Sequence, residues 1–296
     1  MLIALLHNSN AGRGRFDPSP FVRQLQDRGQ QVLYVPVDKK GWEAVFGECI
    51  DRAVIAGGDG TVSRLVPWLA ARKIPFCILA SGTANNCAQA LGQAKKNDVT
   101  LANLASAPTK KVDLGLIISE AGAQFFIESA GAGLLPLSMS EMRASAKNNQ
   151  TKWRRDKKKK LNDAKRLLWA ISRTAPEFRV EVLVDRETIA HDCLLLEITN
   201  TGSIGPGLHL APKADAGDGF LDVVWVPAGK RKDWVNYLKS VLKGEELPAP
   251  AEVRRCRQIT FRNSAVPFHV DGKVFDEIAT PLVITLHPRA LELVET

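Results

Sequence analysis

The sequence lacks several features that would place it at once in a common protein class. It contains neither G-x-x-x-x-G-K-[ST] nor a G-x-G-x-x-G that opens a helix, which excludes a P-loop and the dinucleotide-binding fingerprint. No apolar run approaches ~20 residues, the length that a helix needs to span a bilayer. The five cysteines are odd in number and show no C-x-x-C spacing. We therefore expect reduced thiols in a cytosolic protein.

The positive charge is concentrated in one segment. Ten basic residues and two acids lie between Lys147 and Arg166, a balance that equals the net charge of +8 of the whole chain of 296 residues. The segment could be a solvated helix face, a docking surface for an anionic membrane, or a nucleic-acid site. No recognition motif or interleaved aromatic residue supports nucleic acid, so no such partner is expected. An apolar seam and two tryptophans suit a lipid interface: Leu161, Ala164, Leu168, Ile171, Trp153 and Trp169.

Strand and helix patterns alternate over residues 1–110. Apolar runs at 2–6, 31–37, 53–56 and 75–80 predict strands, and helices are predicted at 20–25, 42–50, after 61 and at 87–91. The first run has no basic start and no small-residue cleavage site, so it predicts a first strand rather than a signal peptide. The alternation predicts a doubly wound parallel sheet in an α/β domain.

Three loops of small polar residues follow strands of this predicted sheet. They contain Asn8, the run Gly57-Gly58-Asp59-Gly60-Thr61, and the run Gly82-Thr83-Ala84-Asn85. Ligands of such sheets bind at the carboxyl ends of the strands, and glycine turns before a helix suit phosphate. A carboxylate beside a polyanion points to Mg²⁺ or to transfer chemistry. The alternative for Asp59 is a helix N-cap in a tight turn.

Strand patterns dominate after residue 110. Strands are expected at 112–118, 124–130, 179–185, 188–199, 221–226, 253–261, 266–270 and 282–286, with a helix at 233–242. These patterns predict an antiparallel β-sandwich domain over residues 111–296, interrupted by the basic helical insert at 134–174. The last strand is a candidate to return to the first domain.

The chain resembles the diacylglycerol kinase catalytic-domain superfamily, which includes soluble bacterial lipid kinases and sphingosine kinases, with NAD kinases more distant. The resemblance rests on five segments in the same order as in the family. They are Asn8 with Gly12, Gly57 to Thr61 with Gly82 to Asn85, Val112-Asp113-Leu114-Gly115, Asn200 to Asp222, and Val270-Asp271-Gly272. The matches in the second domain favour a lipid kinase over an NAD kinase.

The resemblance implies ATP and Mg²⁺ bound between an NAD kinase-like α/β domain and a β-sandwich, and phosphorylation of a lipid hydroxyl. It implies catalytic roles for Asp59 and Asp113 in the acidic network beside the metal. It also implies a structural metal held by Asp215, Asp218 and the carbonyl of Phe220, because hard oxygen ligands suit Mg²⁺ or Ca²⁺. The residues that would bind the nucleotide are Asn8, Gly57, Gly58, Gly60, Thr61, Gly82, Thr83 and Asn85.

The chain departs from the family pattern at its expected proton acceptor. Lys273 stands where the family has the glutamate that follows Asp-Gly, and loss of a general base typically costs ~10²–10⁴ in rate. Asp276 and Glu277 are candidate substitutes or else exposed loop acids. Milder departures are Asn86, where many relatives carry aspartate, and Ser63-Arg64, where they often carry Asn-Glu.

The sequence therefore predicts a cytosolic ATP-dependent lipid kinase that acts on a diacylglycerol-like lipid and contacts the membrane peripherally through Lys147 to Arg166. The alternatives are a catalytically silent nucleotide- or lipid-binding protein with this fold and an NAD kinase-like small-molecule kinase. The sequence is compatible with a homodimer and does not determine the oligomeric state.

Overall fold

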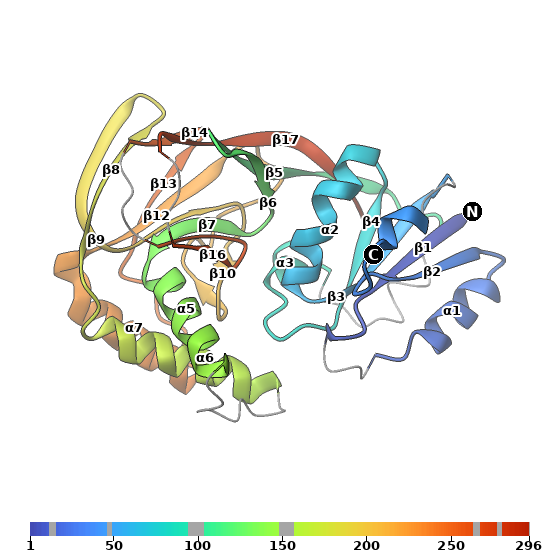
Figure 1. Cartoon of the computed structure of the whole chain (residues 1–296), viewed down its shortest axis with the longest axis horizontal. Coiled ribbons are helices and arrows are strands. Elements are labelled where there is room, and N and C mark those ends of the chain that lie inside the picture. Colours follow the sequence, from blue (N-terminus) through green and yellow to red (C-terminus); the bar gives the residue numbers. More distant parts are fainter. Residues whose placement is uncertain are drawn as a thin grey trace. The chain divides into compact units, whose positions relative to one another are not determined.

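The computed structural model describes residues 1–11, 16–45, 49–93, 104–147, 157–262, 267–276 and 280–295. The chain forms two compact units (Figure 1). Unit 1 comprises Met1–Val112 with Arg289–Thr296, and unit 2 comprises Asp113–Pro288. Two strands, β5 (Thr109–Ser119) and β17 (Leu282–Val294), each contribute residues to both units.

Unit 1 alternates strands with helices. In chain order it contains β1 (Leu2–His7), α1 (Pro18–Gln26), β2 (Gln31–Pro36), the 3₁₀ helix η2 (Trp42–Val45), β3 (Arg52–Gly57), α2 (Asp59–Arg72), β4 (Phe76–Ala80) and α3 (Asn86–Ala90). The parallel strands lie in the order β2-β1-β3-β4, and the end of β17 pairs in parallel with β4. Because the order reverses at β1, the sheet is doubly wound and has a switch point between β1 and β3. The predicted fold of this unit is confirmed.

Unit 2 is built mainly from antiparallel strands. It contains β6 (Gly122–Phe126), β7 (Ser129–Gly133), α5 (Leu134–Lys147), α6 (Lys157–Ser172), β8 (Phe178–Val184), β9 (Glu187–Thr199), β10 (Ser203–Ile204), β11 (Leu208–His209), β12 (Leu221–Pro227), η3 (Ala228–Lys230), α7 (Arg231–Lys243), β13 (Glu252–Cys256), β14 (Gln258–Phe261), β15 (Phe268–Val270) and β16 (Lys273–Phe275), in addition to parts of β5 and β17.

Neighbouring strands of unit 2 run in the order β16-β15-β7-β9-β8-β14-β17, and β12 pairs with β9 and β13. Between the strands lies one apolar core, which includes Phe126, Phe261 and Phe268. A second core joins α5, α6 and α7 to the strands and includes Leu168, Leu195, Val224 and Trp234. The antiparallel β-domain with a helical insert is therefore confirmed.

The C-terminal part of the insert's apolar seam packs inside unit 2. Leu168 on α6 is buried, Ile171 and Trp169 pack against the same core, and α6 contacts both α5 and α7 (Figure 1). The expectation that Trp169 lies at a lipid interface is thus not supported, because the ring is part of this packing. Residues 148–156 of the basic segment, including Trp153, lie outside the described residues.

Two predicted strands are each divided in two, in both cases by an aspartate from elsewhere in the chain. The segment 124–130 is broken between β6 and β7, where the Asp271 carboxylate accepts the N–H groups of Ile127, Glu128 and Ser129. The segment 253–261 is broken at Arg257, where Asp185 accepts two successive N–H groups. Each carboxylate takes over backbone donors that a continuous strand would direct to a neighbouring strand.

Two further predictions of secondary structure were wrong in extent. The predicted helix at 42–50 is a single 3₁₀ turn, Trp42–Val45, within the described residues. The predicted strand at 282–286 continues as far as Val294. None of the helices in the described part of the chain combines the length and apolarity needed to cross a membrane.

Candidate functional site

The three glycine-rich or polar loops of unit 1 lie together at the carboxyl ends of their strands. After β1, Asn8 donates its Nδ2–H to the Thr61 hydroxyl at 2.8 Å and its backbone N–H to the Ala56 carbonyl at 3.1 Å. After β4, Ser81 donates its N–H to the Gly57 carbonyl at 2.9 Å. These bonds tie the loops that follow β1 and β4 to the turn that follows β3.

Gly58 and Gly82 are in close backbone contact. A Cβ added to Gly58 would lie 2.7 Å from the Gly82 Cα, and a Cβ added to Gly82 would lie 2.4 Å from the Gly58 Cα. Only residues without a side chain allow the two turns to approach so closely. Gly60 differs, because a Cβ there would meet nothing within 4 Å. Its backbone therefore borders open space that a ligand could occupy.

The turn after β3 leads directly into the N-terminus of α2. Gly58 is the N-cap and provides no side-chain hydrogen bond to the first turn. Asp59 is the first helical residue, so its alternative interpretation as the N-cap is wrong. A 14-residue helix without a side-chain cap presents backbone donors and a positive dipole end. This arrangement suits an anion such as phosphate.

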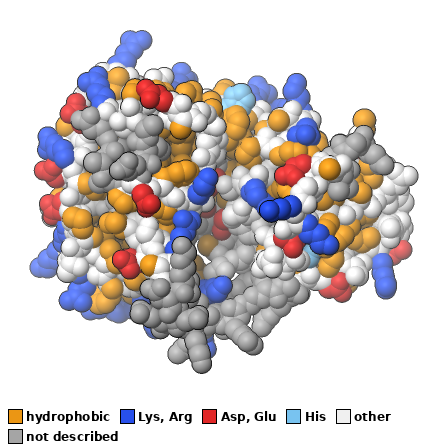
Figure 2. Space-filling model, in the orientation of Figure 1, with side chains coloured by type: hydrophobic (Ala, Val, Ile, Leu, Met, Phe, Trp, Pro, Cys, Tyr) orange, Lys and Arg blue, Asp and Glu red, His pale blue; other side chains and the backbone are white. Residues whose placement is uncertain are grey.

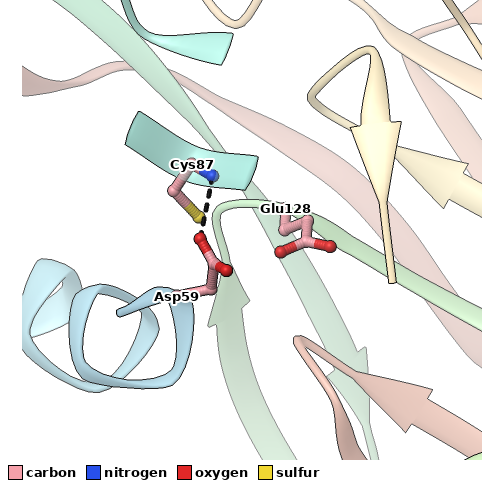
Figure 3. A group of neighbouring side chains, drawn as sticks. All are labelled: Asp59, Cys87 and Glu128. Atoms are coloured by element: carbon pink, nitrogen blue, oxygen red, sulfur yellow. Dashed lines mark hydrogen bonds between the residues drawn. The ribbon is translucent and has the colours of Figure 1, made fainter. Parts of the chain in front are cut away.

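Asp59 links the first turns of two helices. Its Oδ1 accepts the N–H of Cys87 in α3 at 3.0 Å (Figure 3). An ionised carboxylate has about four acceptor sites on two oxygens, so this bond leaves it capacity to bind a cation. Two other residues predicted to bind the nucleotide lie in the loop that follows β4. Asn85 is the N-cap of α3, with a φ of 57°, and Thr83 is exposed.

The side chains of His7 and Asp38, beside the Asn8 loop, both have perturbed pKa values. Burial lowers the pKa of His7, although the Asp38 charge acts against this shift. The Nδ1 of His7 lies 2.9 Å from the Tyr34 hydroxyl, and its Nε2 is buried without a hydrogen-bond partner among the described residues. The Ser9 hydroxyl, which donates to Asp38 at 2.7 Å, lowers the pKa of that carboxyl.

In unit 2 the structure brings Asp113 to the predicted metal loop. Asp113 is buried, and its Oδ2 accepts the Gly219 N–H at 2.8 Å. Its own N–H donates to the Ala216 carbonyl at 2.6 Å, and Asn200 donates to its carbonyl at 2.9 Å. These contacts favour a role for Asp113 in shaping residues 215–220. Its catalytic role stays a prediction.

The oxygen donors of the 215–220 loop fit a metal only in part. Asp215 and Asp218 are hard ligands of the type that Mg²⁺ or Ca²⁺ prefers. However, the Arg255 guanidinium pairs with the Asp218 Oδ2 at 2.5 Å and also lies over the Phe220 ring. A bound cation would therefore share Asp218 with an existing positive charge. Burial raises the pKa of the adjacent Asp222, Arg255 opposes the shift, and Asp218 adds to it.

Sequence reasoning missed Glu128, which is mostly buried between β6 and β7. Its Oε1 accepts the Gly205 N–H at 2.8 Å, and its own N–H is one of the three held by Asp271. The available signal was a single acid in the otherwise uncharged run Phe125 to Gly133. A lone charged residue in such a run is seldom buried without a specific partner.

The comparisons with known proteins agree with this architecture. The diacylglycerol kinase catalytic domain family matches residues 3–117, and the YegS C-terminal NAD kinase beta sandwich-like domain matches residues 140–295, more than half of the chain. A Pseudomonas putida protein named Probable lipid kinase YegS-like is 32% identical over 245 residues, which cover 81% of this chain and 75% of the relative. The chain belongs to the diacylglycerol kinase catalytic-domain superfamily. The predicted resemblance is confirmed.

One further relative and two solved structures are also similar to this chain. A protein named diacylglycerol kinase from Mycobacterium tuberculosis is 28% identical over 256 residues, which cover 84% of this chain and 78% of that protein. A crystal structure of a diacylglycerol kinase from Bacillus anthracis str. Sterne has a TM-score of 0.68 at 18% identity and covers 100% and 96% of the two chains. The structure of an Archaeoglobus fulgidus NAD kinase in complex with ATP has a TM-score of 0.52 at 11% identity. The match covers 100% of this chain and 94% of the NAD kinase chain. These structural likenesses support the fold alone.

Proposed function

We propose that this member of the superfamily transfers the γ-phosphoryl group of ATP to a hydroxyl of a diacylglycerol-like lipid. The observation that carries the proposal is the joining of the Asn8, Gly58 and Gly82 loops in unit 1. The names of the relatives from M. tuberculosis and P. putida support a lipid acceptor. The match of unit 2 to the YegS-type domain favours this acceptor over the substrate of an NAD kinase.

Phosphoryl transfer depends mainly on positioning and on charge stabilisation, because the transition state spreads negative charge over three equatorial oxygens. In unit 1 the uncapped N-terminus of α2 and the open backbone at Gly60 would hold phosphate oxygens. Asn8 and Thr61, joined to each other, would fix the loop beside them. Thr83 and Asn85 belong to the same proposed nucleotide site.

Mg²⁺ is part of the proposal, with Asp59 as its ligand in unit 1. The ion would neutralise charge on the phosphates. The Cys87 N–H orients the Asp59 carboxylate through one oxygen, so the side chain is fixed before a ligand arrives. Asp113 is proposed as a second catalytic acid, and its bond from the Gly219 N–H also shapes the neighbouring loop. Asp215, Asp218 and the Phe220 carbonyl are proposed to hold a separate structural metal in unit 2, beside the positive charge of Arg255.

Peripheral binding to anionic membranes through Lys147 to Arg166 is the proposed way in which the protein reaches its lipid. Lys159, Lys160 and Arg166 are exposed on α6, and each cation near such a surface contributes ~1 kcal/mol. On the face drawn in Figure 2, described basic side chains are interspersed with acidic and apolar ones. Three of the ten basic residues of the segment, Lys152, Arg154 and Arg155, lie outside the described residues.

Isothermal calorimetry tests the nucleotide site. Wild-type protein should bind ATP with Mg²⁺, and the Asp59→Ala variant should bind less tightly in the presence of Mg²⁺ and should not transfer phosphate. Absence of heat at millimolar ATP with Mg²⁺ would contradict the proposal. Lys273 favours one rival, a silent binding protein with this fold. That rival predicts ATP binding without any phosphoryl transfer.

A further inference from the structure

The 215–220 loop of unit 2 is ordered by hydrogen bonds from its own backbone. The Asp215 Oδ1 accepts the Gly217 N–H at 3.0 Å, and the Asp218 Oδ1 accepts the Phe220 N–H at 3.0 Å. Each carboxylate thus uses one oxygen to hold the turn that follows it, as aspartate commonly does in loops. This leaves the Oδ2 oxygen of Asp218 to pair with a cation.

The cation that pairs with this oxygen is the Arg255 guanidinium. Its Nη2 donates to the Asp218 Oδ2 at 2.5 Å, and a bond between two ionised groups is shorter and stronger than one between neutral groups. The side chains of Asp218 and Arg255 are 27% and 53% exposed. The pair therefore lies at the surface of unit 2, where a cation from solvent can reach the carboxylate.

Two features of unit 2 bring Arg255 to this position. Strand β13 pairs with β12 in a register that sets Arg255 opposite Asp222, just after the loop. The guanidinium also lies 4.3 Å from the centroid of the Phe220 ring, which is a cation–π contact. Phe220 would therefore serve a metal through its carbonyl, whereas it holds the arginine through its ring.

A divalent cation at this loop would meet the positive charge of Arg255. Mg²⁺ and Ca²⁺ bind carboxylate oxygens at about 2.0–2.6 Å, so a metal on the Asp218 Oδ2 would lie close to the guanidinium. Like charges at such a separation repel each other even when the surroundings are polarisable. The arginine also already neutralises the carboxylate charge that would attract a metal. A metal would thus bind Asp218 more favourably if Arg255 moved away.

We propose that Arg255 is the resident cation of this loop and competes with the structural metal for the Asp218 Oδ2. The inference rests on the metal site proposed above and gives it two states. In one state Arg255 is paired with Asp218, and in the other a metal is bound there and the guanidinium is released. Arg255 keeps the loop folded without a metal and lowers the affinity for Mg²⁺ or Ca²⁺. The metal is consequently exchangeable in this chain.

The test compares Arg255→Gln with Arg257→Gln in the full chain without nucleotide. Arg257 is a matched control, because it has the same charge and lies over the same Phe220 ring at 4.8 Å, whereas Arg255 makes the ion pair with Asp218. Calorimetry measures the binding of Ca²⁺ and of Mg²⁺, and urea titration measures the unfolding midpoint with and without each ion. Asp218→Asn shows which part of the binding belongs to the loop rather than to another site such as Asp59.

Removal of Arg255 should strengthen metal binding at the loop. We expect Arg255→Gln to bind Ca²⁺ there about tenfold more tightly than the wild type, because a competing charge is lost. Added Ca²⁺ should raise the unfolding midpoint of this variant more than that of the wild type, since a ligand of the folded state stabilises it. Arg257→Gln should behave as the wild type. Arg255→Lys keeps the charge without the planar fork and should show a smaller gain; it carries the comparison if Arg255→Gln does not fold.

The possible outcomes separate this inference from the metal site on which it rests. If Ca²⁺ binds the loop with equal affinity in the wild type and in Arg255→Gln, the competition is overturned and the metal site stands. If Asp218→Asn removes no part of the binding in any variant, the metal site fails and the competition fails with it. An equal gain in Arg255→Gln and Arg257→Gln also counts against the competition, because a general loss of positive charge would explain it.

Discussion

The Nε2 of His269 lies within 3.0 Å of both carboxylate oxygens of Glu197, and the two side chains are 2% and 0% exposed. A carboxylate buried so completely is costly unless it is paired. The pair joins β9 to β15, and through the Gly272 N–H it reaches the Asp271 turn. A polar contact within the core of unit 2 thus supports a motif at the surface of that unit.

His269→Phe should strongly destabilise the protein. The substitution leaves the buried Glu197 carboxylate without its partner, and the expected cost is ~3–5 kcal/mol in the free energy of unfolding. Urea denaturation measures this change, and His287→Phe, at an exposed position, serves as the matched control. The double variant with Glu197→Met should recover much of the loss. A single variant as stable as the control would show that the pair contributes little.

Gly58→Ala should disturb the proposed nucleotide site of unit 1, and Gly60→Ala should leave the fold unchanged. The first Cβ would lie 2.7 Å from the Gly82 backbone, whereas the second meets nothing within 4 Å. Forcing the turns apart should cost ~1–3 kcal/mol and weaken ATP binding. Thermal unfolding and calorimetry with ATP distinguish the two variants. Equal unfolding midpoints for both would refute the close packing of the turns.

His7 should make stability depend on pH. Burial lowers its pKa in the folded state below the ordinary value of 6.5, so the folded state favours the neutral ring. The resulting stabilisation is fully present above pH 6.5 and is lost as the pH falls through the lowered pKa. Urea unfolding between pH 7.5 and about 5 should show this loss, and His7→Gln should flatten the curve. Parallel curves for the two proteins would exclude the effect.

Lys273→Glu should change activity little or lower it, because the glycine loops of unit 1 and the acids Asp59, Asp113 and Asp218 are all retained in this chain, as expected of an active kinase. Lys273 is exposed, and its contact with Phe275 is peripheral. The variant also restores the residue type of the family, so a disabled kinase would respond with a gain of ~10²-fold or more. Steady-state phosphoryl transfer measures the difference. A large gain from an undetectable wild-type rate would identify the chain as a binding protein.

The parallel sheet and its loops could be predicted because local sequence carries the signal. The strand at β3 is a continuous apolar run that ends in glycines, and both its burial and its turn follow from nearby residues. The Asn8 to Thr61 bond joins positions far apart in sequence, yet it follows from the rule that parallel strands present their carboxyl ends at one edge.

The network of unit 2 could not be predicted in this way. The break between β6 and β7 depends on Asp271, which is more than 140 residues further along the chain. Nothing in the run around Glu128 indicates that its amides are bonded to a distant carboxylate. The ion pair of Asp218 with Arg255 is likewise set by the pairing of β12 with β13. Such contacts arise from tertiary structure and leave no local periodicity.

The central claim is that the protein phosphorylates a lipid with ATP. The most direct measurement incubates purified protein with γ-labelled ATP, Mg²⁺ and a total lipid extract, and follows the label into the organic phase. The account predicts a labelled lipid that is absent with Asp59→Ala and whose mobility matches phosphorylated diacylglycerol or a related lipid. Label that stays entirely in ATP and free phosphate, from protein shown to bind ATP, would contradict it.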